Sequence, residues 1–278
     1  MKFGAFVALT DYSMGPAELG KALEERGFES LFVPEHTHIP VPTPDGRQFS
    51  KPYMDLMDPF LALTAVAAAT ERLLLGTGVC LVVQHDPIVL AKEISTLDLL
   101  SGGRVLFGVG AGGDGPELRD HGVDPSRRFK LLRERVEAMQ HIWSEAEAEY
   151  HGEFVDFDPI WQWPKPVQKP HPPVLIGGNA PNTFQRVVRY GDGWIPLLEG
   201  LELPLGDRIA ELNALAEEHG RDRLPVSVIG ASRPPGPEVI EQLAEAGVER
   251  LVIPFPPADA EKVLPLLDEQ AKVAEQYS

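Results

Sequence analysis

The sequence contains a single cysteine, Cys80, among 278 residues. An internal disulfide and a metal cluster held by several thiolates are therefore both excluded. Long hydrophobic runs are also missing, because no stretch approaches the about 18 uninterrupted apolar residues that a membrane-spanning helix needs. The first residues begin directly with a strand-like run and show no apolar segment followed by a small-residue cleavage site. From these absences we expect a cytoplasmic protein without a membrane partner.

Basic residues are scarce relative to acidic ones. The chain has 25 Lys and Arg against 42 Asp and Glu, which gives a formal net charge of −17. An acidic surface repels phosphate backbones, so no nucleic acid is expected as a partner. Hydrophobic residues make up 43% and charged residues 24%, which are ordinary proportions for a protein with a full core. We expect residues 1–278 to form a single domain.

Short apolar runs alternate with helical patterns along the whole chain. The runs predict eight strands, at residues 2–8, 30–34, 73–79, 104–110, 173–178, 193–197, 225–231 and 250–255. They are rich in Val, Leu, Ile and Phe without strict alternation, as expected for strands covered on both faces. The helical patterns predict eight helices, at residues 16–28, 58–71, 87–104, 126–143, 181–190, 204–219, 235–246 and 260–276.

Eight strand–helix pairs in order predict a parallel sheet with right-handed crossovers. Eight units in 278 residues favour an α/β fold of the (β/α)8 TIM barrel type, and a doubly wound open sheet is the alternative. Three stretches exceed plain connections: residues 35–57 after the second strand, 111–125 after the fourth and 146–172 before the fifth. The first two follow strands, so they lie at the mouth where barrel enzymes carry their chemistry.

The stretch PEHTHIP at residues 34–40 raises the question of a metal site. His36 and His38 are two residues apart and point to the same face if the strand continues, and His-x-His at the end of a barrel strand is typical of amidohydrolase-type metal enzymes. A divalent metal needs about three or four protein ligands. The ends of the fifth and sixth strands, at 177–181 and 197–199, contain no histidine. We therefore assign no metal site.

Glycine-rich turns follow three consecutive strands: GTGVC at 76–80, GVGAGGDG at 108–115 and IGGN at 176–179. Glycine inside a strand often marks a bulge or the close approach of a ligand or another backbone, although a twisted strand end is the simpler explanation for the first. The IGGN turn leads into a helix, whose free N–H groups suit a phosphate. Together the three turns indicate a large flat ligand lying close to the backbone.

Several segments resemble the bacterial luciferase-like superfamily and, within it, the branch that uses the deazaflavin coenzyme F420. The resemblance covers nearly the whole chain. It rests on GFESLFVPEHTHIP (27–40), LLLGTGVCLVVQHDP (73–87), LAKEISTLDLLSGGRVLFGVGAG (90–112), RRFKLLRERVEAMQHIW (127–143), YHGEFVDF (150–157) and PKPVQKPHPPVLIGGNAPNTFQRVVRYGDGW (164–194). It is more specific for the superfamily than for the coenzyme, since users of flavin mononucleotide share most of these segments.

The resemblance implies a (β/α)8 barrel with the coenzyme ring across its mouth. Glu35 would lie near the polar edge of the ring, and His36 would lie at the substrate face, where an imidazole suits proton transfer near neutral pH. The alternative is that His36 only packs under a loop. A non-prolyl cis peptide behind the ring matches the Gly78–Val79 bond. The cofactor-binding positions that the resemblance implies are Gly78, Val79, Cys80, Ala111, Gly112, Gly177, Gly178, Asn179 and Ala180.

The chain departs from the sugar-phosphate dehydrogenases of this family. They carry a glutamate after the strand-four GxG, where this chain has Gly113, and a lysine after GDGF/W, where it has LLEG (197–200). Asp114 and Glu117 are nearby carboxylates, but the sequence positions neither. We therefore expect hydride transfer between F420 and a small organic substrate rather than sugar-phosphate oxidation. The alternatives are an FMN-dependent monooxygenase with a separate flavin reductase, and a catalytically silent coenzyme-binding protein.

The resemblance also suggests a homodimer formed through helices near strands two and three, where DPFLALTAVAAAT (58–70) is apolar enough to be buried, although a core helix would show the same pattern. Arg127 and Arg128 are candidates for the coenzyme's anionic tail, with unpaired surface arginines as the alternative. His38 is expected to pack rather than to bind. The sequence leaves the substrate and the direction of hydride transfer open.

Overall fold

The structure, a computed structural model, describes residues 1–41, 49–113, 115–201, 205–230 and 233–277. Its main feature is one parallel sheet with the strand order β8-β7-β4-β3-β2-β1-β10-β9. The strands are β1 (Lys2–Val7), β2 (Ser30–Val33), β3 (Leu74–Thr77), β4 (Val105–Val109), β7 (Val174–Gly177), β8 (Gly193–Ile195), β9 (Ser227–Ile229) and β10 (Arg250–Phe255). Single parallel bridges, Trp194 to Val226 and Leu197 to Ile229, join β8 to β9 and nearly close the sheet. The predicted barrel is confirmed, and the open-sheet alternative is wrong.

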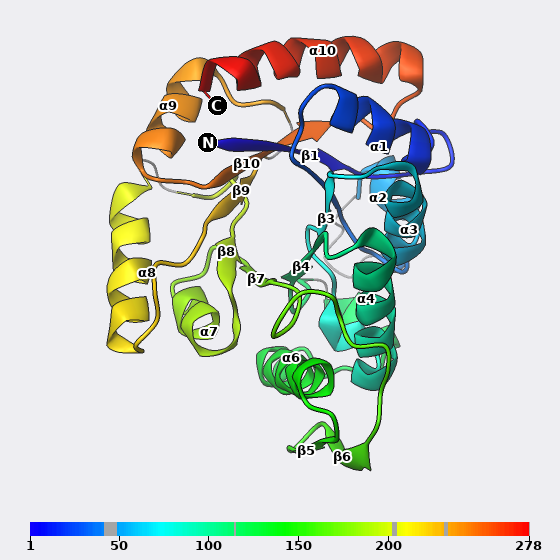
Figure 1. The fold of residues 1–278 in the computed structure, drawn as a ribbon, viewed down its shortest axis with the longest axis vertical. Helices are drawn as coiled ribbons and strands as arrows, with labels where there is room; N and C mark the ends of the chain where they lie inside the picture. Colours follow the sequence, from blue (N-terminus) through cyan, green and yellow to red (C-terminus); the bar gives the residue numbers. More distant parts are fainter. Residues whose placement is uncertain (42–48, 114, 202–204, 231–232, 278) are drawn as a thin grey trace.

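Helices surround the strands, as Figure 1 shows. They are α1 (Pro16–Glu25), α3 (Pro59–Ala69), α4 (Pro87–Ser101), α6 (Arg128–Ser144), α7 (Thr183–Tyr190), α8 (Gly206–Glu218), α9 (Pro237–Glu245) and α10 (Ala260–Tyr277). The starts of α3 and α4 follow from local chemistry: each has proline in its first turn, and Asp58 and Asp86 accept hydrogen bonds from free backbone N–H groups there. A helix able to cross a membrane is not found in the described part of the chain, because none is both long and apolar enough.

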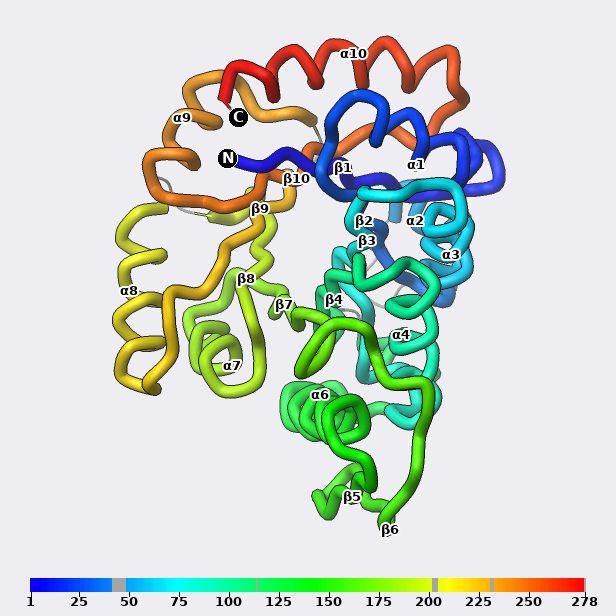
Figure 2. Tube along the Cα trace, in the orientation of Figure 1, coloured from blue at the N-terminus to red at the C-terminus, as the bar shows by residue number. Residues whose placement is uncertain are grey.

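The longer connections contain short elements of their own. Residues 49–57 include α2 (Lys51–Met54), and the segment after β4 forms α5 (Gly115–Asp120). A short 3-10 turn, η1 (Val82–Gln84), follows β3. The stretch before β7 contains an antiparallel pair, β5 (Ala148–His151) and β6 (Asp156–Ile160). Figure 2 shows this pair at the opposite end of the molecule from α10 and from both termini.

The core has two layers. Side chains that point into the barrel form a compact cluster of Phe32, Leu106, Leu175, Ile195, Ile229 and Val252. A larger cluster lies between the outside of the sheet and the helices, and it includes Trp143, Phe107 and Phe184. Because both faces of each strand are covered, the strands are apolar throughout, which explains why the sequence shows runs rather than alternation.

Two buried arginines close the amino-terminal end of the barrel. Arg250 donates to both carboxylate oxygens of Glu29, at 2.5 and 2.6 Å. Arg104 donates instead to five uncharged oxygens, among them the Ala67 and Thr70 carbonyls at the end of α3 and the Ser101 carbonyl at the end of α4. A cation at the carboxyl ends of two helices is favoured by their dipoles. Hydrogen bonds from two buried guanidinium groups therefore hold the amino-terminal end of the barrel together. The opposite end remains available for ligands.

Candidate functional site

The predicted site residues follow the carboxyl ends of four neighbouring strands. Glu35 and His36 come after β2, residues 78–80 after β3, residues 110–112 after β4 and residues 177–180 around the end of β7. The strands are parallel and adjacent in the order β2, β3, β4 and β7. Their ends therefore meet at one mouth of the barrel, the position of active sites in this fold.

The chain bulges directly after β3. The Gly78–Val79 peptide bond is cis, as the resemblance predicted. Hydrogen bonds hold the bulge on both sides: Gly78 N donates to the Val33 carbonyl at 2.8 Å, and Cys80 N donates to the Gly108 carbonyl at 2.8 Å. The bulge is thus tied to β2 and β4 and forms a fixed part of the mouth.

Glycines around the bulge make room for one side chain, that of Val79. A Cβ atom on Gly110 would lie 2.6 Å from Val79 Cγ2, and one on Gly177 would lie 3.0 Å from Val79 Cγ1. Val79 therefore rests directly on the backbones that follow β4 and end β7. Gly76 has a different reason, because its absent Cβ would lie 2.3 Å from the ring of Phe32 inside the barrel. The close approach inferred at Gly76 is internal packing rather than ligand contact.

Glu35 lies behind the bulge in a buried network. Its side chain is only 3% exposed. One oxygen accepts from Leu81 N at 2.5 Å and the other from His85 Nε2 at 2.8 Å. Burial raises the pKa of Glu35, but the hydrogen bond and charge of His85, together with hydrogen bonds from Leu81 and Cys80, outweigh burial, so its pKa falls below the usual 4.5. The same pair raises the pKa of His85 above 6.5, although burial alone lowers it.

Cys80 completes this network. Its thiol is fully buried, and burial together with the Glu35 charge raises the pKa of Cys80 well above its usual value. The donor atoms of Glu35, Cys80 and His85 lie within 4.8 Å of one another, a spacing that a metal ion could use. Mutual hydrogen bonds already account for the cluster, since a protonated thiol and a protonated imidazole both donate to the carboxylate. From the sequence, we considered a different set of possible metal ligands, namely Glu35, His36 and His38.

His36 faces the mouth with a partner from another element. Its Nδ1 lies 2.9 Å from Glu117 Oε2, and the carboxylate accepts this hydrogen bond. Glu117 belongs to α5 and is 2% exposed, and its second oxygen has no partner among the described residues. The rings of Phe49 and Tyr53 meet His36 edge-on, with centroids 5.9 and 5.7 Å away. The pair formed by His36 and Glu117 is thus built into the mouth, and His36 Nε2 has no described protein partner.

His38 lies in a separate, exposed network. Its Nε2 is 3.0 Å from Asp120 Oδ2, and its Nδ1 is 3.0 Å from the hydroxyl of Thr37, which also contacts His121. Glu35, His36 and His38 therefore turn toward three different carboxylates or imidazoles rather than toward one point. The expectation that His38 packs rather than binds remains a prediction.

The turn after β7 is reinforced by Asn179. Its amide donates to the Leu197 and Glu199 carbonyls at 2.8 and 3.0 Å, and its oxygen accepts from Leu197 N at 3.1 Å. The side chain of Asn179 thus fixes the loop after β8. Any contact from residue 179 to a phosphate would come from its backbone. Gly178 has φ +118°, a conformation that side chains rarely adopt, and a Cβ there would lie 3.5 Å from the Thr183 hydroxyl.

Two arginines that have no carboxylate partner among the described residues lie near the start of α7. The guanidinium groups of Arg128 and Arg186 both stack on the ring of Phe129, at 4.5 and 4.0 Å. Within the described ranges, neither forms an ion pair, and Arg186 donates to Thr183 at the first position of α7. Arg127, by contrast, pairs with Glu153. From the sequence, Arg127 and Arg128 were the candidates for binding the anionic tail of the coenzyme, and Arg186 was not recognised.

Several residues of the site were missed or left unplaced by the sequence. Glu117 was noted as a nearby carboxylate, and Asp114 lies outside the described residues. His85 stands seven residues past the cis peptide in VVQHDP and was treated only as a spare histidine. A signal was available for both, since a histidine and a glutamate follow consecutive strands that carry the glycine-rich turns.

Comparison with known proteins identifies relatives. The model of the Luciferase-like monooxygenase family matches residues 16–235. An uncharacterized protein of Mycobacterium tuberculosis is 42% identical over 274 residues, which is 94% of each chain. The F420-dependent hydroxymycolic acid dehydrogenase of the same organism is 27% identical over 208 residues, 73% of this chain and 53% of that protein. The oxygenase component of a flavin-dependent trigonelline monooxygenase from Acinetobacter baylyi is 32% identical over 136 residues, 48% of this chain and 38% of that protein.

Among solved structures, an F420-dependent secondary alcohol dehydrogenase in complex with an F420-acetone adduct superimposes with a TM-score of 0.80 at 18% identity, covering 100% of this chain and 99% of that one. At this identity the similarity shows the fold. The family match covers most of the chain and is accompanied by a close full-length relative. The protein is a member of the luciferase-like monooxygenase family.

Proposed function

We propose that this protein is a coenzyme F420-dependent oxidoreductase that transfers a hydride between the deazaflavin and a small organic substrate. The observation that carries the proposal is the pairing of a partly exposed His36 with the buried Glu117 at the barrel mouth. Hydride transfer to or from a carbon–oxygen group requires a proton to move at the oxygen, and an oriented imidazole is suited to that work near neutral pH.

Glu117 sets the state of His36. Because Nδ1–H donates to the Glu117 carboxylate, Nε2 is the atom left to exchange a proton with substrate. When an alcohol is oxidised, Nε2 accepts the hydroxyl proton, and the carboxylate stabilises the resulting imidazolium. When a carbonyl is reduced, the imidazolium returns the proton to the oxygen. Bound F420 supplies the hydride donor or acceptor.

The bulge supports the proposed ring site. Val79 stands on Gly110 and Gly177, so a flat ring would rest on one aliphatic side chain and on backbone without Cβ atoms. Glu35 is engaged with Leu81 and His85 behind the bulge. We therefore propose that Glu35 positions the bulge rather than exchanging a proton. Residues 111–112 and 177–180 remain the proposed contacts to the rest of the coenzyme.

Arg128 and Arg186 support an anionic tail. Their guanidinium groups flank Phe129 beside the amino end of α7, whose backbone N–H groups also favour an anion. Two adjacent cations without described carboxylate partners suit a tail with more than one negative charge. This feature favours F420 for the site, and replacing Arg128 should make coenzyme binding less sensitive to salt.

An FMN-dependent monooxygenase with a separate flavin reductase is the second candidate. The flavin-dependent relative is 32% identical over about half of this chain, whereas the F420-dependent relative extends over 73% of it. Oxygen uptake that depends on reduced flavin would identify the monooxygenase.

The test begins with fluorescence titrations of the purified protein with F420 and with FMN. Tight binding of F420 alone, followed by acceptor or donor turnover, would support the proposal. His36→Ala should lower turnover strongly while coenzyme affinity changes little, and His219→Ala, on the exposed end of α8, is the matched control. Equal turnover in wild type and His36→Ala, or binding of FMN alone, would overturn it.

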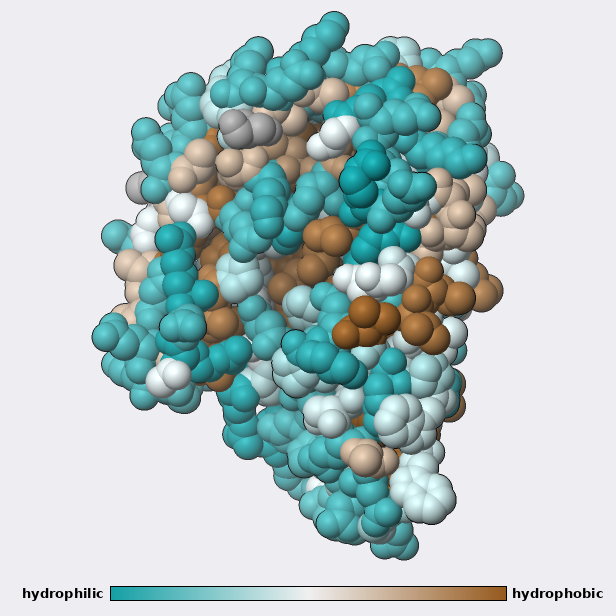
Figure 3. All heavy atoms as spheres, in the orientation of Figure 1, coloured by the Kyte–Doolittle hydropathy of each residue, from teal (hydrophilic) through white to brown (hydrophobic). Residues whose placement is uncertain are grey.

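We also propose a homodimer through α3 and α4. These helices expose large apolar side chains: Leu61 is 75% exposed, Val89 56% and Leu100 61%. Figure 3 shows hydrophobic atoms gathered at the right of this face, over the region where Figure 1 places the two helices. Light scattering should give twice the chain mass for the wild type, and Leu61→Glu should reduce the measured mass to that of one chain. A monomeric wild type would refute the dimer.

A further inference from the structure

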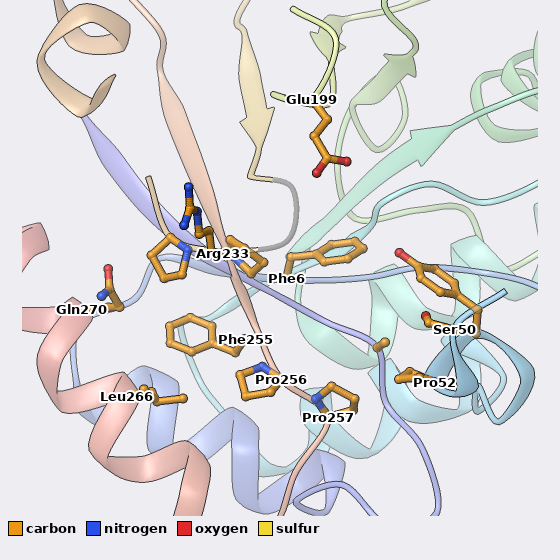
Figure 4. Close-up of a pocket in the computed structure, with 14 residues that line it drawn as sticks. Phe6, Ser50, Pro52, Glu199, Arg233, Phe255, Pro256, Pro257, Leu266 and Gln270 are labelled. Atoms are coloured by element: carbon orange, nitrogen blue, oxygen red, sulfur yellow. The ribbon is translucent and has the colours of Figure 1, made fainter. Parts of the chain in front are cut away.

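A second feature of the mouth is a cavity of about 650 Å³ between β1, β10 and α10. Figure 4 shows the side chains that line it, with Phe6 from β1, Phe255 from the end of β10 and Leu266 and Gln270 from α10. The volume falls in the range of small-molecule sites, about 300–1,000 Å³. This cavity lies on the side of the mouth away from β4 and β7, where the proposed coenzyme contacts lie.

The cavity approaches the proposed proton-transfer pair through Tyr53. Tyr53 lines it and also meets the ring of His36 edge-on, with centroids 5.7 Å apart. Ser50 and Pro52, from the same short segment, line the same end. A molecule that presents its reacting carbon to His36 would therefore extend into this cavity.

The walls of the cavity are mainly apolar. Phe6, Phe255 and Leu266 contribute side chains, and Pro254, Pro256 and Pro257 contribute rings. Prolines also lack a backbone N–H, so this wall offers few hydrogen-bond donors. The body of the occupant is accordingly apolar.

Gln270 interrupts the apolar face at the far end of the cavity. It follows Val263 and Leu267 along the buried face of α10 and is itself only 9% exposed. Its amide has no hydrogen bond to any side chain or backbone group of the described residues, and it lines the cavity. Its amide atoms are not among the fully buried polar atoms of the described residues that lack a partner, so they are open to the cavity. This amide can therefore donate to a polar group of a bound ligand.

Charge divides the cavity into two ends. Arg233 lines the end near Gln270, and in the part of the chain that the structure describes no carboxylate lies within ion-pair distance of it. Glu199 lines the cavity elsewhere and contributes to raising the pKa of Tyr53, after burial. Figure 4 shows Arg233 and Gln270 toward one side of the cavity and Ser50 and Pro52 toward the other. An anion is thus attracted to the Arg233 end and repelled from Glu199.

We infer that the substrate is an apolar organic acid, with its carboxylate bound by Arg233 and Gln270 and its reacting carbon–oxygen group placed at His36. This inference rests on the proposed function for the reaction, but the acid-binding cavity can be tested without coenzyme. Arginine and a primary amide together offer several N–H donors to one carboxylate, which a neutral ester does not reproduce with the same strength.

The test is calorimetric titration of the protein with octanoate and with methyl octanoate. Octanoate should bind, and the ester should bind at least about tenfold more weakly. Arg233→Met and Gln270→Leu should each weaken octanoate by about tenfold or more and leave the ester unchanged. The controls are Arg72→Met, which is exposed before β3, and Gln276→Leu, on the exposed face of α10.

Gln270→Glu guards against loss of packing in the leucine variant, because it keeps the shape and adds a charge that should abolish octanoate binding. Equal affinity for acid and ester, or unchanged octanoate binding in the Arg233 and Gln270 variants, would overturn the inference. A parallel F420 titration separates the two proposals. Octanoate binding without F420 binding would refute the proposed function alone, and F420 binding without acid selectivity would refute the inference alone.

Discussion

Replacing Glu35 by Gln should reduce the free energy of unfolding by about 3–5 kcal/mol. The amide oxygen of the new side chain can still accept from Leu81 N, so the backbone bond is kept. Its NH2 group, however, faces the donors of His85 and Cys80, and two hydrogen bonds to a charged acceptor are lost. Each is worth about 1.5–3 kcal/mol, and domains are stable by only about 5–15 kcal/mol.

The effect should depend on pH in a way that identifies its cause. Glu35 has a lowered pKa, so its contribution is present above its usual 4.5 and is lost as the pH falls through the folded value. His85 has a raised pKa, so its contribution is complete below 6.5 and is lost as the pH rises through the folded value. The difference between wild type and Glu35→Gln should therefore be largest between about pH 4.5 and 6.5.

Urea unfolding followed by circular dichroism, at several pH values between about 4 and 9, measures this difference. Glu217→Gln on α8 is the matched control, because Glu217 is exposed and makes no hydrogen bond through its side chain within the described residues. A loss below about 1 kcal/mol, or a loss that is the same at every pH, would show that Glu35 is not held as a buried, paired carboxylate.

Three further predictions concern packing, a buried cation and a buried thiol of the barrel. Gly108→Ala should destabilise the protein by about 1–3 kcal/mol or more, because the added Cβ would lie 2.0 Å from the Thr77 carbonyl oxygen; Gly206→Ala, with open space around it, is the control, and equal melting temperatures would contradict the prediction. Arg104→Met should cost about 3–5 kcal/mol, since it orphans buried carbonyls at the ends of two helices; a change below about 1 kcal/mol in urea unfolding would disprove it. Cys80 should resist iodoacetamide at neutral pH in the native protein and react fully in urea, because burial raises the pKa of its thiol; rapid native labelling, followed by mass spectrometry, would show that the site is open.

Most of the barrel could be predicted because its signals are local. The run at 250–255 coincides with β10, and the expected helices at 58–71 and 87–104 each end within three residues of α3 and α4. Proline at a helix start, an aspartate before it and glycine after its end act within a few residues, so they can be recognised in the sequence. The cis peptide was found in another way, through resemblance to the family.

The partners of the catalytic candidates could not be predicted in the same way. His36 and Glu117 are separated by 81 residues, and Glu35 and His85 by 50. The order of strands predicts that their loops meet at the mouth, but it does not predict which side chain faces which. Glu35 and His36 are adjacent in the chain and yet have different surroundings: Glu35 is buried and accepts from Leu81 and His85, whereas His36 is partly exposed and bonds to Glu117.

The difference between packing and function appears where a local pattern is broken. Gly76 interrupts a buried strand, where the sequence suggested a bulge, a twisted strand end or the close approach of a ligand, and Gln270 interrupts the apolar face of a helix. The structure distinguishes the two cases by the neighbours of each residue. The ring of Phe32 fills the space at Gly76, whereas no described protein group forms a hydrogen bond with the amide of Gln270. A broken pattern that the fold itself satisfies belongs to packing. One that the described residues leave unsatisfied, beside a cavity and an arginine such as Arg233 with no carboxylate partner among those residues, is the basis of the ligand site that we propose.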